Sequence, residues 1–343
     1  MRAIDLRLWF IGLTVVVFIG SSYQNARWLR ADYDGPARFY TREMSHLEDV
    51  SARSPSPRII FAGGSSVIYA VDAKAIEHEI GIRVVNMAMY NRIGSDANYF
   101  DYLLPHIRKG DLVIYSSASW FRNSTRQAEA DETREARRLA DRLWKFAQTD
   151  LSERHHVEWP LLLPISGVPI FKRLSARTLV DPVPANWQRD DHGALVRCPT
   201  KPASLEPHAA PSAAPSRKVI ARSGEFVRNA VSRGARVIFF ETPILIVARD
   251  QKKWSRYREE LRSQLAQLAP VLDVTETRIF NADPHSFCDS AFHIDDDVRA
   301  EWNQSLSAQL QQLPAVLALH RIGTGVTPLQ PGDVDKSRHP RAD

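Results

Sequence analysis

Short apolar runs alternate with amphipathic segments in the first third of the chain. The runs at residues 58–62, 83–89 and 111–117 are apolar almost throughout, which predicts strands buried on both faces. Between them, residues 72–81 and 95–110 carry apolar side chains at helical spacing behind capping residues. Strands that alternate with helices in this way predict an α/β fold with a parallel sheet covered on both faces.

The same alternation returns in the second half of the chain. Helices are expected at residues 219–234 and 254–270, and strands at residues 235–243 and 277–281. A final helix is expected behind Asp295, because apolar residues recur there every four positions after a capping residue. The predicted domain therefore extends almost to the end of the chain.

The middle of the chain departs from this pattern. A charged amphipathic helix is expected at residues 125–148, followed by a segment rich in Pro and Trp and by a low-complexity stretch at residues 201–216. We interpret this region as an insertion that lies over the domain. The predicted organisation is an anchor at 1–30, a linker at 31–57, an α/β domain at 58–321 with the insertion at about 124–216, and a disordered tail at 322–343.

The N-terminal region contains an uncharged apolar run from Leu8 to Tyr23. Such a run predicts a membrane helix, with Trp9 and Tyr23 at the interfaces. A signal peptide has a similar length, but no small-x-small cleavage site follows. We expect an uncleaved anchor of the inner (cytoplasmic) membrane that spans it once. Basic residues flank both ends of the run, so we place the domain in the periplasm because the N-terminal tail is short and the domain is large.

Composition narrows the classes of partner. Hydrophobic residues make up 44% of the chain and charged residues 25%, which is typical of a globular protein. The net charge of +5 comes from 45 basic and 40 acidic residues that are scattered along the chain. No basic and aromatic pattern typical of nucleic-acid binding is present, so we expect no nucleic-acid partner. A mildly basic surface suits anionic lipid or acidic polysaccharide.

The chain has two cysteines, Cys198 and Cys288. In an oxidising periplasm they can form one disulfide, and two separate thiols are the alternative. The sequence does not decide between them.

Two segments carry candidate chemistry. Gly63-Gly64-Ser65-Ser66 ends the first strand, and the carboxyl ends of parallel strands form the ligand crevice of an open sheet. A capped tight turn is the simpler explanation for that segment alone. The second segment runs from Asp289 to His293, just before the final helix. A histidine can take the proton of a serine hydroxyl, and a nearby carboxylate can orient the imidazole. A solvated loop is the alternative for this second segment.

Together these segments resemble the SGNH (GDSL-like) hydrolase superfamily. The shared layout is a strand that ends in Gly-x-Ser, a strand followed by Asn and small residues, and an Asp-x-x-x-His element before the last helix. The resemblance covers residues 58–313 apart from the insertion. It implies a flavodoxin-like three-layer sandwich in which Ser66 is the nucleophile, His293 the general base and Asp289 its orienting acid.

The resemblance also implies donors for an oxyanion. Asn86 opens the second block, Ala88 stands where relatives often have glycine, and Asn91 is a further candidate. The third strand ends in Ser116 to Ser119, where the superfamily's asparagine is expected. Because of these departures from the superfamily pattern, an inactive descendant of the superfamily stays an alternative.

The predicted topology is similar to that of envelope SGNH proteins that work with membrane-bound O-acyltransferases. It implies an extracytoplasmic O-acyltransferase or esterase that acts on an envelope polysaccharide through an acyl-serine. The alternative is a non-catalytic SGNH-fold protein that binds glycan or docks on a membrane-bound acyltransferase or polysaccharide synthase. We expect no cofactor and no metal, because His155 and His156 lack further ligands at metal spacing and Asp295–Asp297 are explained by helix capping.

Overall fold

The chain divides into two compact units. The larger unit comprises residues 47–90, 100–128 and 186–343, and the smaller comprises residues 1–46, 91–99 and 129–185. The computed structural model describes residues 39, 41–89, 96–121, 187–198, 204–211, 214–275 and 279–323. The sheet and the candidate site both belong to the larger unit.

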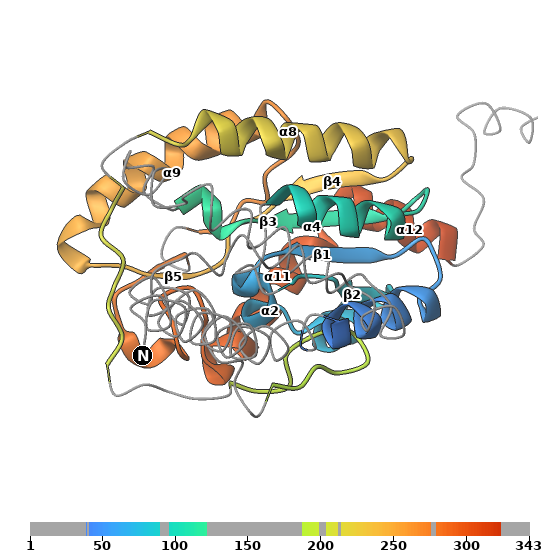
Figure 1. Cartoon of the computed structure of the whole chain (residues 1–343), viewed down its shortest axis with the longest axis horizontal. Coiled ribbons are helices and arrows are strands. Elements are labelled where there is room, and N and C mark those ends of the chain that lie inside the picture. The colour runs from blue at the N-terminus through green and yellow to red at the C-terminus, as the bar shows by residue number, and fades with distance from the viewer. Residues whose placement is uncertain are drawn as a thin grey trace, which may run out of the picture. The chain divides into compact units, whose positions relative to one another are not determined.

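Four strands form one parallel sheet in the order β2-β1-β3-β4 (Figure 1). They are β1 (Ile59–Gly63), β2 (Val84–Asn86), β3 (Leu112–Ser116) and β4 (Arg236–Phe239). In the register, Ile60 lies between Val85 and Val113. All residues of these four strands except Arg236 are buried without alternation, as is typical of a sheet covered on both sides. The predicted α/β class with a parallel sheet is confirmed.

Helices lie on both faces of this sheet. They include α2 (Ser65–Ala70), α3 (Ala73–Ile80), α4 (Asp96–Leu103), α8 (Arg217–Ser232) and α11 (Asp296–Gln311). Phe100 of α4 stacks on Phe226 of α8 with ring centroids 4.5 Å apart, and both rings contact Tyr115 of β3, so α4 and α8 share a face. Helix α11 packs against α3 and α2, on the opposite side of the sheet from α8 (Figure 1).

The remaining elements lie between the sheet strands, before the loop that precedes α11, or after α11. They are η1 (Leu104–His106), η2 (Ala118–Phe121), β5 (Ile244–Leu245), η7 (Ala248–Asp250), α9 (Gln251–Ala266), β6 (Phe280–Asn281), η8 (Pro284–Ser286) and α12 (Pro314–Gly323). Strands β5 and β6 pair in parallel as a second, small sheet. Buried Trp254 of α9 packs on Phe280 of β6. The chain then passes through η8 into the segment that carries Asp289 and His293.

Local capping signals place several helix ends correctly. The side chain of Asp72 accepts a hydrogen bond from the backbone N–H of Ala75 and begins α3. Gly81, with φ of 65°, ends that helix in the left-handed region where glycine is favoured. Asp295 occupies the N-cap position of α11 as predicted, although its side chain makes no capping hydrogen bond.

The predicted linker at 31–57 contains a helix instead. Residues 41–53 are helical, and Met44, Leu47 and Val50 are buried at three-residue spacing. These apolar residues form a face that packs, which a linker lacks. Near the other end of the chain, α12 continues to Gly323, just beyond the predicted domain boundary.

Several expectations concern residues outside the described part of the chain. They are the apolar run at 8–23, the amphipathic helix at 125–148, His155 and His156, and the tail beyond residue 323. Among the helices that the structure describes, none has the length and apolar character needed to span a bilayer.

Candidate functional site

Asp289 and His293 form a close pair in the loop that precedes α11. Their contact joins Nδ1 of His293 to Oδ1 of Asp289 at 2.5 Å. The loop is tight, because the backbone N–H of Cys288 donates to the carbonyl of His293 at 2.7 Å and the N–H of His293 donates to Ser290. The structure therefore brings together the two residues that the sequence paired. Their catalytic role stays a prediction.

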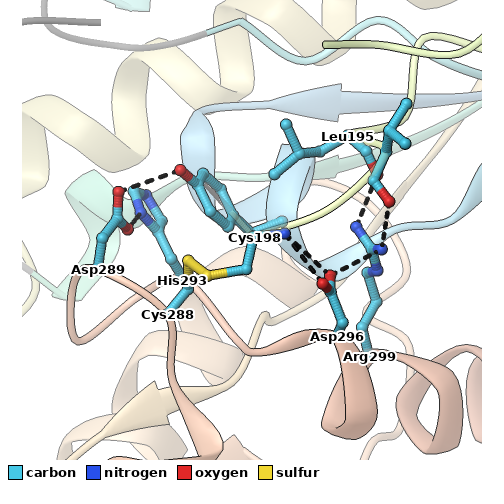
Figure 2. Close-up of a disulfide and its surroundings, with 9 residues drawn as sticks. Leu195, Cys198, Cys288, Asp289, His293, Asp296 and Arg299 are labelled. Carbon is cyan, nitrogen blue, oxygen red and sulfur yellow. Dashed lines mark hydrogen bonds and ion pairs between the residues drawn. A yellow bond between two sulfur atoms is a disulfide. The ribbon is translucent and has the colours of Figure 1, made fainter. Parts of the chain in front are cut away.

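The surroundings favour the charged form of Asp289. The side chain of His293 is 6% exposed and that of Asp289 is 24% exposed. Figure 2 shows the two side chains in contact. Burial opposes the charge of Asp289, but the hydrogen bonds from His293 and Tyr69, together with the charge of His293, outweigh it and hold the pKa of the carboxyl below its ordinary value of 3.8. An ionised carboxylate against Nδ1 is the arrangement that orients a histidine base.

Tyr69 of α2 completes this cluster. Its ring lies parallel to the His293 imidazole, with centroids 3.9 Å apart and an interplanar angle of 3°. Its hydroxyl donates to Oδ2 of Asp289 at 3.1 Å. Tyr69 was not among the predicted site residues, because it belongs to no motif and α2 was not predicted. A six-residue helix directly behind a strand gives too little periodicity to detect.

The turn that leads into α2 depends on Gly63. Its φ is +150°, and a Cβ at this position would lie 2.1 Å from the carbonyl oxygen of Ser116. Any side chain would therefore push β1 away from the end of β3. Helix α2 begins directly after Gly64, so that Ser65 is its first residue. Gly63 thus allows α2 to begin directly at the carboxyl end of β1.

Ser66 does not occupy the position that the sequence assigned to it. It is 0% exposed, and in the described part of the chain its Oγ has no hydrogen-bond partner, His293 included. Consecutive residues of a helix point about 100° apart, so Ser66 faces the core while Ser65 stays partly exposed. The expected contact between Ser66 and His293 is therefore absent, and the expectation of Ser66 as nucleophile needs correction.

Ser65 lies on the helix face that carries Tyr69. The two residues are four positions apart, and residues at this spacing are neighbours on one side of a helix. Because Tyr69 stacks on His293, Ser65 is one helical turn from the residue that contacts the Asp289–His293 pair. No hydrogen bond joins Ser65 to His293, both of which the structure describes.

Asn86 and Ala88 are engaged within the protein. The Asn86 amide nitrogen donates to the carbonyls of Val67 and Val71, at 3.3 and 3.1 Å, and its Oδ1 accepts from the Ala88 N–H at 3.1 Å. Both residues are fully buried. They join α2 to the end of β2, and their role as oxyanion donors stays a prediction. Asn91 lies outside the described residues.

Residues 187–198 form a hairpin that reaches from the end of β2 to the Asp289–His293 loop. At one end, the backbone N–H of Asn86 donates to the carbonyl of His192 at 2.7 Å, and Arg189 donates to the carbonyl of Ala88 at 2.8 Å. At the other end, Cys198 forms a disulfide with Cys288 (Figure 2). The question that the sequence left open is thus settled in favour of a bridge.

The base of α11 holds the same hairpin. Arg299 donates to the carbonyl of Leu195 at 2.7 Å and pairs with Asp296 at 2.9 Å (Figure 2). Asp296 in turn accepts from the backbone N–H of Cys198 at 3.0 Å. Asp296, in the first turn of α11, therefore binds this hairpin. Within the described residues, no group of three or more His, Cys, Asp or Glu side chains is placed to hold a metal ion.

Comparisons with known proteins add no relative. No protein-family model matches the chain, and neither the curated proteins nor the solved structures contain a significant match. The resemblance to SGNH hydrolases therefore depends on the motifs and on the geometry described above.

Proposed function

We propose that this chain is an SGNH-type serine acyltransferase or esterase in which Ser65, and not Ser66, is the nucleophile. The observation that carries the proposal is the Asp289–His293 pair, whose histidine is buried and packs through Tyr69 on the helix that begins at Ser65. The strand order β2-β1-β3-β4 supports it, because a flavodoxin-like sheet begins with the same order and binds its ligands at the carboxyl ends of the strands.

The proposed chemistry is acyl transfer in two steps. Oγ of Ser65 attacks the acyl carbon while Nε2 of His293 takes the hydroxyl proton, because Nδ1 is already bound to Asp289. The leaving alkoxide then receives that proton from His293. In the second step, water or a glycan hydroxyl loses its proton to His293 and attacks the acyl carbon. The bond from this carbon to Oγ of Ser65 breaks, and His293 returns the proton to Oγ. The ionised Asp289 stabilises the imidazolium in both steps. Catalytic hydrogen bonds often shorten only when the substrate binds, so the missing bond between Ser65 and His293 is compatible with this role.

A non-catalytic accessory protein is the second candidate. It is favoured by the hydrogen bonds that occupy Asn86 and Ala88, because those groups are then unavailable to an oxyanion. Loss of one such donor typically slows a reaction about a hundredfold to a thousandfold. A protein of this type would bind glycan or a membrane enzyme without turnover.

The proposed setting is the periplasmic face of the inner membrane, with an envelope polysaccharide as substrate. A single apolar run at residues 8–23 would anchor the chain, and a membrane-bound O-acyltransferase would supply the acyl group. The Cys198–Cys288 disulfide supports an oxidising compartment.

Labelling with a fluorophosphonate tests the proposal, because the reagent phosphonylates only an activated serine. We expect the full-length chain to label, and Ser65→Ala and His293→Ala to abolish the signal. Ser66→Ala is the matched control and should label like the wild type, since its hydroxyl is buried. If no serine labels and the protein still binds polysaccharide, the accessory role is correct.

A further inference from the structure

We propose that Tyr69 is a positioning residue that fixes the mutual orientation of Asp289 and His293. The catalytic consequence of this inference rests on the proposed function, but the positioning itself does not. The side chain of Tyr69 contacts both members of the pair. Its ring stacks on His293, and its hydroxyl donates to Asp289.

The two contacts of Tyr69 constrain different movements. The parallel ring contact, at 3.9 Å between centroids, prevents the imidazole of His293 from tilting out of its plane. The hydroxyl binds Oδ2 of Asp289, while Nδ1 of His293 binds Oδ1 of the same carboxylate. Each carboxylate oxygen thus has its own donor, so the carboxylate cannot rotate without loss of a hydrogen bond.

Tyr69 is itself held in place. It is 1% exposed, and its ring makes an edge contact with Trp187 at 6.0 Å between centroids. Trp187 begins the 187–198 hairpin, in which Arg189 stacks over the Trp187 ring and donates to the carbonyl of Ala88. Tyr69 therefore lies between a fixed hairpin and the imidazole.

The position of Tyr69 in the chain gives this contact a function. It lies four residues after Ser65 on α2, whereas His293 lies on a loop more than 200 residues further along. The stacked rings are thus a direct link between the helix of the proposed nucleophile and the loop of its proposed base. A slip of the loop along the ring would change the distance between the two catalytic groups, which is the type of error that costs rate.

A buried aromatic residue can also serve packing alone, and the hydroxyl separates the two roles. Phenylalanine fills the same volume and keeps the ring stack, but it cannot donate to Asp289. If Tyr69 serves packing alone, Tyr69→Phe should leave the Asp289–His293 pair unchanged. Under positioning, the loss of the donor to Oδ2 removes stabilisation of the carboxylate, and the Asp289–His293 pair holds its proton to higher pH.

The test uses Tyr69→Phe and Tyr69→Leu in the full-length chain, solubilised in mild detergent. Tyr102→Phe is the matched control, because it removes a hydroxyl from another buried tyrosine beside a histidine, His106. The carbonyl of His106 binds Arg58, directly before β1, so the control lies at the opposite end of the sheet from Ser65. Two quantities are measured, the proton NMR signal of the Nδ1–H of His293 and the pH dependence of fluorophosphonate labelling.

We expect Tyr69→Phe to move the NMR signal and to shift the acid limb of the labelling profile to higher pH. The labelling rate near neutral pH should fall by about tenfold or more, as expected for loss of a hydrogen bond to a charged group. Tyr69→Leu should broaden or abolish the NMR signal, and Tyr102→Phe should change neither quantity. The NMR signal is assigned by its loss in His293→Gln.

The two hypotheses fail in different ways. An NMR signal and a pH profile that are unchanged in Tyr69→Phe would overturn the positioning role, even if the wild type labels fully. A wild type that does not label would end the acyl-transfer proposal, while a moved NMR signal in Tyr69→Phe would still establish that Tyr69 orients the pair. Because Tyr69→Phe keeps the ring, it remains informative if Tyr69→Leu fails to fold.

Discussion

The disulfide between Cys198 and Cys288 joins the 187–198 hairpin to the loop of Asp289 and His293, with Cα atoms 5.9 Å apart across 90 residues of sequence. Cys288 is adjacent to Asp289, and its backbone N–H binds the carbonyl of His293. The bridge therefore restrains the same loop that Tyr69 contacts. Two independent attachments hold the Asp289–His293 pair in place.

Removal of this bridge should loosen the loop and destabilise the domain. We expect the double substitution of Cys198 and Cys288 by serine to lower the free energy of unfolding by about 2 to 5 kcal/mol, the usual effect of losing a native disulfide. Urea denaturation measures the change. Unreduced, denatured wild-type protein should show no reactive thiol, and two thiols per chain would contradict the bridge.

Replacement of Ser66 by alanine should leave the fold intact or stabilise it slightly. Its hydroxyl is fully buried and has no hydrogen-bond partner among the described residues, and such a buried group costs about 1 to 3 kcal/mol. Thermal unfolding should therefore show an equal or higher midpoint. Ser116→Ala is a useful comparison, because the Ser116 Oγ is also buried without a hydrogen-bond partner among the described residues. A clear loss of stability in Ser66→Ala would show that the hydroxyl has a partner.

Replacement of Asn86 by alanine should reduce stability strongly. The change leaves the buried carbonyl of Val71 and the N–H of Ala88 without their partners, at about 1 to 3 kcal/mol for each group. Chemical denaturation measures the loss, and exposed Asn229→Ala serves as the control, with an expected change within about 0.5 kcal/mol. Wild-type stability combined with lost reactivity in Asn86→Ala would instead identify Asn86 as an oxyanion donor.

The ionised state of Asp289 predicts a specific acid dependence of stability. Its pKa is lower in the folded protein than its ordinary value of 3.8, so its contribution is fully present above that value and is lost as the pH falls through the folded pKa. In Asp289→Asn, the free energy of unfolding should therefore change less steeply with pH below about pH 4 than in the wild type. As a control, Asn in place of the exposed Asp101 (Asp101→Asn) should leave the dependence of the unfolding free energy on pH unchanged. Urea denaturation at a series of pH values measures this dependence. Equal slopes in wild type and Asp289→Asn would contradict the arrangement.

The sequence by itself determined the order along the chain of the four strands of the main sheet and of helices α3, α4, α8, α9 and α11. Buried parallel strands need continuous apolar runs, and helix ends need caps such as Asp72 and Gly81, so these signals are local. It also paired Asp289 with His293, because four residues of loop place the two side chains within reach. The helix at residues 41–53 was missed, because its apolar spacing lies in a polar stretch.

Tertiary structure alone decided the roles of the remaining site residues. Ser65 and Ser66 are chemically identical, and only the packing of α2 determines which of them faces the core. Asn86 bonds to α2 carbonyls 15 and 19 residues before it, and Tyr69 meets a loop 220 residues after it. Contacts across such distances depend on how the layers pack and leave no periodic signal in the chain.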